Sequence, residues 1–398
     1  MPVMILKKYN LLVTYPNLDN TPLHVIGSLS NKQGNGSNFW TPKFLRANAD
    51  FWLSLLVAIF VIGFGIFLGW SNYRVVTPAP SPGYHYVAEP HNPLSFMASW
   101  DAPNYLYIAR HGYTSEMWTN WFPLYPLLIN AANHLVPSPL DSALLIAWAS
   151  LVGAIYFYIK IARLLFGITD EFEPLRAVIF FVLFPTAVFL IAPFTESLFS
   201  LLALGAIYFA LKKQWLFSAL LTMLCTATHI TGPFVVVLIA LILLEQKTHI
   251  QYVLLASAIG SLGLLDYMLY LYLRFHNPIA YIQTQVAKHG WDQSHYLTLL
   301  TSTTFTTGLL ITLILLSAIY WWPRKKSFAV YSLLYPAVPL AGKQYGGFDR
   351  YVLMAFPIQF MLYGYFRDKK KSYAFVTAIL GIMWTYFLLQ YAGGYIGS

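Results

Sequence analysis

The sequence has few of the features that soluble enzymes carry. Charged residues make up 10% of the 398 residues and hydrophobic residues 58%, whereas a soluble domain is roughly a quarter charged. A single cysteine, Cys225, lies in an apolar run, which excludes an internal disulfide and a cysteine metal cage. A Gly-rich phosphate loop of the P-loop or Rossmann type is missing, which argues against a nucleotide-driven reaction. These absences predict a polytopic membrane protein.

The sequence gives little support for binding of nucleic acid or of zinc. The net charge of +9 comes from short basic clusters between apolar runs, not from a continuous patch, so nucleic acid is not an expected partner. The ten histidines include no pair at the spacing of zinc ligands, so we predict no metal-binding residue. A divalent ion held by acidic residues remains open as a cofactor.

The chain divides into a polar start and an apolar remainder. Residues 1–50 are Asn-rich and basic and lack the apolar core of a signal peptide, which predicts a largely flexible cytosolic tail. Residues 51–398 predict one transmembrane domain with about eleven helices, several of them shorter than the roughly 20 residues of a straight span. The apolar segments are 51–71, 142–162, 177–194, 197–211, 215–229, 232–245, 251–273, 303–322, 328–341, 351–366 and 372–392.

The segment 122–136 decides the orientation. It is apolar, but it is short and contains two prolines near its start. If it lies at or dips into the outer surface, most Lys and Arg residues fall on the cytosolic side, as the positive-inside rule requires. A full span here would invert every later segment. We therefore predict a cytosolic tail, an outer C-terminus, and two outer loops at 72–141 and 274–302.

The first outer loop carries a dense polar and aromatic block. Its sequence is Trp100-Asp101-Ala-Pro-Asn-Tyr105-Leu-Tyr107-Ile-Ala-Arg110-His111-Gly-Tyr113, followed by Trp121-Phe-Pro123-Leu-Tyr125-Pro126. Aromatic faces pack on sugar C–H surfaces, and a carboxylate among them can take the proton of a hydroxyl. Asp101 is therefore the candidate catalytic base. The alternative is that Asp101 only caps a helix with proline in its first turn.

The order of the motifs carries a resemblance. Trp-Asp-x-x-x-Tyr-x-x-Ile-Ala-x-x-Gly-Tyr and Phe-Pro-Leu-Tyr-Pro are followed by Phe184-Pro-Thr-Ala-Val-Phe189, Phe194-Thr-Glu196-Ser-Leu-Phe199 and a late Asp349-Arg350-Tyr351 with Phe356-Pro357. Over roughly residues 50–365 this pattern resembles the PIG-V family, GPI mannosyltransferase 2-like members of the glycosyltransferase C superfamily.

The resemblance implies an inverting transferase that acts on the outer or luminal membrane face. Its donor would be a polyprenyl-phosphate sugar, typically mannose, and its acceptor a glycolipid or glycan. The family's catalytic acidic residue maps onto Asp101. His229 is a departure, because similar proteins usually have an arginine before Gly232.

The leaving phosphate keeps its charge, so it needs cations or hydrogen-bond donors rather than a general acid. Arg350 has the planar fork that suits phosphate, and Lys343 and His229 are the next candidates for this contact. The predicted substrate-binding residues are Trp100, Tyr105, His111, Trp121, Tyr125, Glu196, Gln285, Trp291 and Tyr351. The aromatic residues among them could instead form an interfacial belt, Glu196 could cap a helix, and Arg350 could snorkel to the interface.

The main alternative function is a lipid or sugar transporter or flippase without transferase activity. Such proteins often show inverted repeats, and this chain has no internal repeat. A membrane scaffold is a third interpretation, but it leaves the Trp-Asp block unexplained. Because the chain has no long luminal insert, we expect a multi-pass prokaryotic plasma membrane protein, or an endoplasmic reticulum protein if it is eukaryotic.

Overall fold

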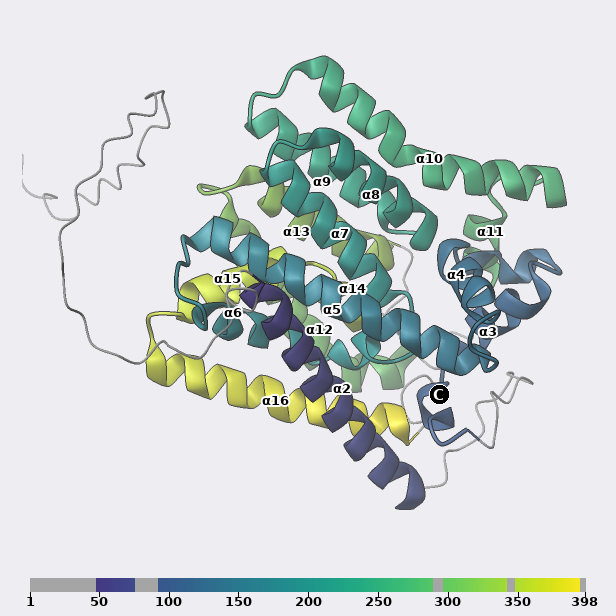
Figure 1. Cartoon of the computed structure of the whole chain (residues 1–398), viewed down its shortest axis with the longest axis horizontal. Coiled ribbons are helices and arrows are strands. Elements are labelled where there is room, and N and C mark those ends of the chain that lie inside the picture. The colour runs from purple at the N-terminus through teal and green to yellow at the C-terminus, as the bar shows by residue number, and fades with distance from the viewer. Residues whose placement is uncertain (1–47, 76–91, 289–295, 342–347, 394–398) are drawn as a thin grey trace, which may run out of the picture. The chain divides into compact units, whose positions relative to one another are not determined.

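The computed structural model describes residues 48–75, 92–288, 296–341 and 348–393, all within the compact unit Phe44–Ser398 (Figure 1). These residues form helices and turns, and none of them forms a strand. The predicted all-α fold is confirmed. The predicted cytosolic tail lies almost wholly outside the described residues, so its boundary stays a prediction.

Among the described residues, four helices are long and apolar enough to cross a membrane: α2 (Ala49–Val75), α5 (Pro139–Phe166), α10 (Ile250–Phe275) and α16 (Lys370–Ala392). Shorter apolar helices are α7 (Glu196–Leu211), α8 (Trp215–Thr228), α9 (Gly232–Glu245) and the part Gly308–Trp321 of α12 (Tyr296–Trp321). The other elements are η1 (Ser95–Met97), α3 (Ala102–His111), η2 (Glu116–Asn120), α4 (Leu124–Ala132), α6 (Glu173–Val182), η3 (Ala187–Leu190), α11 (Ala280–Lys288), α13 (Lys326–Ala341), α14 (Phe348–Leu353) and α15 (Pro357–Phe366). The chain is a polytopic membrane protein; the count of eleven spans stays a prediction.

The segment 122–136, on which the predicted orientation depends, contains the short helix α4. α4 has nine residues, so at 1.5 Å per residue it is about 13.5 Å long, less than half of a hydrocarbon core. It packs on α3 and α5: Asn130 donates to the Ala109 carbonyl at 2.7 Å, and the Tyr125 hydroxyl donates to the Ala143 carbonyl at 2.9 Å. This length fits a surface or re-entrant segment.

Two of the predicted apolar segments are interrupted. In 177–194, α6 ends at Val182 and only the 3-10 turn η3 precedes α7. In 351–366, α14 ends at Leu353 and α15 begins at Pro357. Proline lacks the backbone N–H that a continuing helix needs, and Pro185, Pro193 and Pro357 lie at or beside these interruptions. Since η3 packs against α14, the two interruptions meet.

The helices pack closely around a core. α5 packs on α7, α7 on α8, and α8 on α10. A Cβ atom at Gly263 of α10 would overlap the Met223 carbonyl of α8, so only glycine permits this approach. The Thr226 hydroxyl then donates to the Gly260 carbonyl at 2.8 Å, which joins the two helices.

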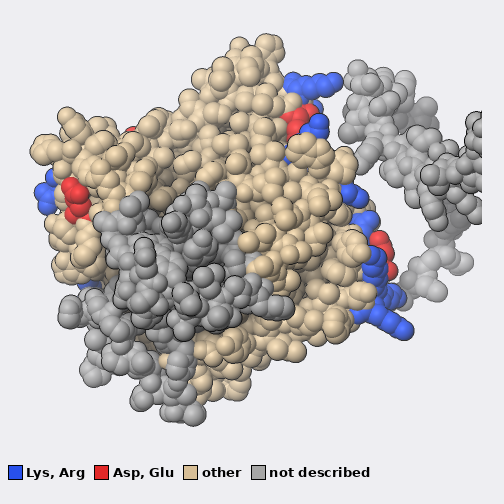
Figure 2. Space-filling model, turned by 180° about the vertical axis from the view of Figure 1, so that it is seen from behind, with Lys and Arg blue, Asp and Glu red and all other residues tan. Residues whose placement is uncertain are grey.

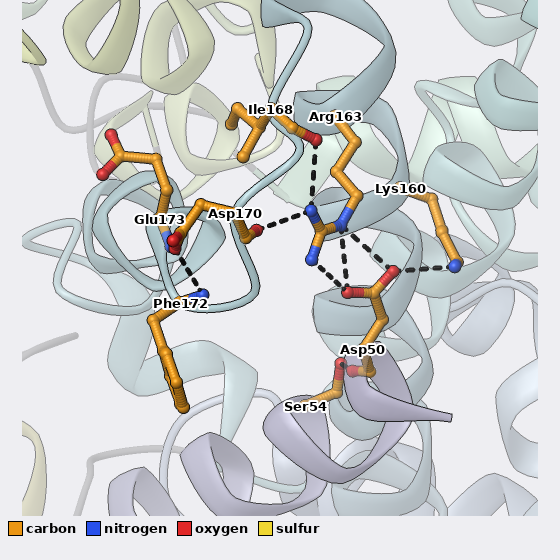
Figure 3. Close-up of polar contacts among 8 residues, drawn as sticks. All are labelled: Asp50, Ser54, Lys160, Arg163, Ile168, Asp170, Phe172 and Glu173. Atoms are coloured by element: carbon orange, nitrogen blue, oxygen red, sulfur yellow. Dashed lines mark hydrogen bonds and ion pairs between the residues drawn. The ribbon is translucent and has the colours of Figure 1, made fainter. Parts of the chain in front are cut away.

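The helix ends that carry the basic clusters meet at one end of the molecule, here called the basic end. Arg163 of α5 binds Asp50 of α2, with an Nη2–Oδ1 distance of 2.8 Å (Figure 3). Arg176 of α6 donates to the Arg367 carbonyl at 2.6 Å, and Lys325 lies 3.4 Å from Glu245. Figure 2 shows charged atoms at two opposite edges, and the surface of described residues that is visible between them is largely uncharged. This is the charge distribution of a membrane-spanning bundle.

Candidate active site

Asp101 lies at the start of α3, but its side chain does not cap that helix. The residue occupies the N-cap position and makes no side-chain cap hydrogen bond. The preceding Trp100 has a φ of 60°, a left-handed conformation that is uncommon for a residue with a bulky side chain. The capping alternative therefore fails, and the Asp101 carboxylate has another partner.

That partner is Arg350 of α14, which is 249 positions away in the sequence. Its Nη1 donates to Asp101 Oδ2 at 2.7 Å, and its Nε lies 3.1 Å from Glu196 Oε1. One guanidinium thus bridges two carboxylates; we call these three residues the triad. The side chain of Asp101 is 17% exposed and that of Glu196 only 1%, so Asp101 is on the accessible side.

Aromatic rings surround the Arg350 guanidinium. Its central carbon lies 5.2 Å from the ring centre of Trp100, 5.7 Å from those of Phe189 and Phe194, and 5.9 Å from that of Tyr351. Ring faces attract cations. Burial by itself lowers the pKa of Arg350, but the charges of Glu196 and Asp101 outweigh it and raise the pKa well above its usual value. Arg350 is therefore a permanent cation in a nearly dry environment.

Glu196 is the first residue of α7, and its carboxylate contacts Arg350. Its Oε2 accepts a long hydrogen bond of 3.4 Å from the Thr195 hydroxyl. Its Oε1 accepts no hydrogen bond within the described part of the chain, although Arg350 lies 3.1 Å away. A fully buried carboxylate is thus held mainly by the charge of Arg350.

Tyr105 lies on α3 one turn after Asp101 and contacts Thr195, the residue before Glu196. Its hydroxyl lies 3.4 Å from Thr195 Oγ1, and its ring meets Tyr125 edge to face at 5.3 Å. Burial, and then the charges of Asp101 and Glu196, raise the pKa of Tyr105 well above its usual value. Tyr105 therefore stays protonated, and Asp101 is the better base. Tyr125 is fully buried and packs against the ring of Tyr105.

His229 lies next to Tyr351, whose ring stands between it and Arg350. Its imidazole is 5.4 Å from the ring of Tyr351, which itself lies beside Arg350. Its Nδ1 is 2.7 Å from Thr231 Oγ1, and the Thr231 hydroxyl donates to the Tyr335 hydroxyl at 2.6 Å. This nitrogen is thus engaged within the protein.

The other predicted substrate residues lie elsewhere. His111 and Trp118 stack on Tyr107 at 4.5 and 4.2 Å, and Trp121 lies 6.0 Å from Trp118. These rings all belong to the predicted first outer loop. Lys343 and Trp291 lie outside the described residues; Gln285 lies on α11, but its side chain is not described. Asp266, a carboxylate within the predicted apolar segment 251–273, is exposed on α10.

Phe189, Phe194 and Thr195 were not among the site residues predicted from the sequence, yet all three contact triad residues. The signal was present, because all three stand in the proline-interrupted stretch before Glu196. No three His, Cys, Asp or Glu side chains lie together as metal ligands among the residues described. Because Arg350 already bridges the two triad carboxylates, a divalent ion there would have to displace it.

A family model for mannosyltransferase (PIG-V) matches residues 85–288, just over half of the chain. The chain belongs to the PIG-V mannosyltransferase family. The match includes Asp101, Glu196 and His229 and ends before Arg350. The contact between Arg350 and the matched region is therefore a finding of the structure.

Two curated relatives are similar to part of the chain. The chain is 33% identical over 121 residues to the GPI alpha-1,6-mannosyltransferase 2 of Homo sapiens, which covers 28% of this chain and 24% of that protein. It is 28% identical over 117 residues to the GPI mannosyltransferase 2 of Drosophila pseudoobscura pseudoobscura, covering 27% and 25%. Each match spans about a quarter of the relative.

Proposed function

We propose that this protein is an inverting mannosyltransferase that moves mannose from a polyprenyl-phosphate donor to an acceptor hydroxyl. The observation that carries the proposal is the 2.7 Å contact between Asp101 and Arg350. It joins a candidate base and a phosphate-binding cation among aromatic rings. Membership of the mannosyltransferase family supports the choice of sugar.

The reaction needs both groups. The acceptor oxygen attacks the anomeric carbon of the donor as Asp101 takes its proton. The bond between that carbon and the phosphate oxygen breaks, and the polyprenyl phosphate leaves with the electron pair. Its phosphate then carries two negative charges instead of one. Arg350 stabilises this added charge, so its interaction strengthens towards the transition state.

We place this chemistry on the outer or luminal face of a membrane. Glu196 of the triad begins α7, whereas Lys212 and Lys213 follow the other end of that helix. The positive-inside rule assigns the side with the basic clusters to the cytosol. The acceptor would be a glycolipid or glycan. Both relatives are animal proteins, so they lend no support to the expected prokaryotic plasma membrane.

The decisive experiment is transfer itself. Purified protein incubated with polyprenyl-phosphate mannose and membrane extracts should release polyprenyl phosphate and place the mannose on an extractable acceptor. Failure of transfer with every extract, by protein that is folded in thermal melts, would contradict the proposal.

Sidedness is tested by thiol labelling in a Cys225→Ala background. A cysteine at Ser115, which is exposed beside η2, should react with an impermeant reagent from outside. A cysteine at Lys213, which is exposed between α7 and α8, should react only after permeabilisation. The reverse pattern would place the triad on the cytosolic face.

The interrupted segments give one argument for a transporter, because transporters use broken helices at their binding sites. Liposomes that contain the protein decide between the two. Movement of a labelled polyprenyl-phosphate sugar between leaflets without sugar transfer would favour a flippase, whereas transfer without movement would favour the enzyme.

A further inference from the structure

The triad contains two carboxylates and one cation, and this imbalance has a consequence for the proposed reaction. Asp101 must act as a base, yet its Oδ2 accepts a 2.7 Å bond from Arg350. The oxygen lone pair that accepts this bond is not available to the proton of an acceptor hydroxyl. Arg350 must also contact the donor phosphate, yet it already holds two anions. In this arrangement neither group is ready for its role.

We infer that donor binding exchanges one anion for another on Arg350: the donor phosphate displaces Asp101, while Glu196 keeps hold of the guanidinium. The inference rests on the proposed function. Glu196 is thus a positioning residue that acts through Arg350, and Asp101 is released as a base only when a donor is present. Such coupling ties activation of the acceptor hydroxyl to occupancy by the donor.

The geometry indicates which carboxylate leaves. The Asp101 side chain is 17% exposed and stands on the accessible side, so an entering phosphate reaches its bond first. Glu196 is 1% exposed and follows Thr195 at the start of α7, so it has no route to solvent. Arg350 contacts the two through different atoms, Nη1 for Asp101 and Nε for Glu196. The Nη1 bond can therefore break while the Nε contact remains.

Charge supports the exchange. With Asp101 and Glu196 both paired to Arg350, the triad has one net negative charge. A donor phosphodiester brings one more, and it replaces a carboxylate of equal charge at the guanidinium. The released carboxylate is neutralised when it takes the acceptor proton, at the moment when the leaving phosphate gains its second charge. Glu196 and the phosphate dianion then share the cation.

A pair of variants tests the exchange by equilibrium binding of a short-chain polyprenyl-phosphate mannose in detergent. Asp101→Asn removes the competing anion and should tighten donor binding by about five-fold or more. Glu196→Gln removes the anion that shares Arg350 with Asp101, so Arg350 pairs with Asp101 alone and donor binding should weaken by a similar factor. The double variant should bind the donor at least as well as wild type.

Simple removal of negative charge predicts something else, because it would tighten binding in both single variants. That result, or unchanged binding in Asp101→Asn, would overturn the exchange. A polyprenyl mannoside without phosphate is the matched neutral ligand, and its binding should not respond to either change. If Glu196→Gln does not fold, Thr195→Ala replaces it: the charge stays, the 3.4 Å bond to Glu196 Oε2 is lost, and donor binding should weaken slightly.

The two proposals fail separately. Wild-type protein that neither binds the donor nor transfers mannose overturns both. Wild-type protein that binds and transfers, with Asp101→Asn no tighter than wild type, overturns only the exchange.

Discussion

Two ionic clusters occupy different parts of this bundle, and they are built on opposite principles. At the basic end, Asp50 is shared by two cations, Lys160 at 2.7 Å and Arg163 at 2.8 Å (Figure 3). Arg163 also donates to the carbonyls of Ile168 at 3.1 Å and Asp170 at 2.8 Å. In the triad, a single cation is shared by two carboxylates.

The contrast separates a cluster of structural contacts from the site of the proposed reaction. The Asp50 carboxylate accepts several hydrogen bonds, and the cluster joins α2 to the end of α5. Glu196 Oε1, by contrast, is buried without a hydrogen bond from the described residues. A buried polar group in that state is costly unless a ligand or a reaction uses it. Satisfaction of hydrogen bonds, rather than the presence of charge, thus distinguishes the two clusters.

The largest expected effect is on turnover. Asp101→Asn should lower the rate of mannose transfer by roughly 100-fold or more, because it removes the base while preserving shape. Initial rates with saturating donor measure this. Asp50→Asn, the same substitution in the structural cluster, is the matched control and should leave the rate per folded molecule unchanged. Equal losses of transfer rate in Asp101→Asn and Asp50→Asn would contradict the distinction between the structural cluster and the triad.

Arg350 should affect the use of the donor. Arg350→Ala should weaken it by about 1.5–3 kcal/mol, since one charged hydrogen-bonding contact is lost. Arg350→Lys keeps the charge but loses the planar fork, so its effect should be smaller. The KM values for donor and acceptor measure the difference, and the acceptor value should barely move. Unchanged donor dependence in Arg350→Ala would limit this residue to a structural role in the triad.

Asp50 should affect stability instead. Asp50→Asn leaves Lys160 and Arg163 without their carboxylate, and the free energy of unfolding should fall by about 1.5–3 kcal/mol. Denaturant unfolding in a mild detergent measures this. Asp50 is 8% exposed, so solvent can replace the lost contacts only in part. Stability equal to wild type would mean that the cluster contributes no net energy.

The smallest effect is expected at Tyr105. Tyr105→Phe removes the 3.4 Å contact with Thr195 Oγ1 but keeps the ring that packs on Tyr125. A neutral hydrogen bond of this length contributes about 0.5–1.5 kcal/mol or less, so turnover should fall by no more than roughly ten-fold. A loss as large as that of Asp101→Asn would show that Tyr105 takes part in proton transfer.

Local chemistry made part of the site predictable. The sequence predicted Asp101 from a carboxylate among aromatic residues, and Arg350 from its planar fork. It did not predict that the two bind each other, because 249 residues separate them and nothing in either segment specifies the partner. Tyr125 was predicted to bind substrate, but it is fully buried against Tyr105. Its burial results from the packing of α4 against α5, which the sequence did not reveal.

Composition alone determined that this protein is a helical membrane protein, because a chain with 10% charged residues cannot cover a soluble surface and helices satisfy their own backbone in lipid. The basic clusters likewise determined which helix ends meet. The tertiary structure decided that the breaks before Glu196 and after Arg350 meet. The physical reason is that proline marks where a helix stops, whereas packing among distant helices decides what the exposed ends face.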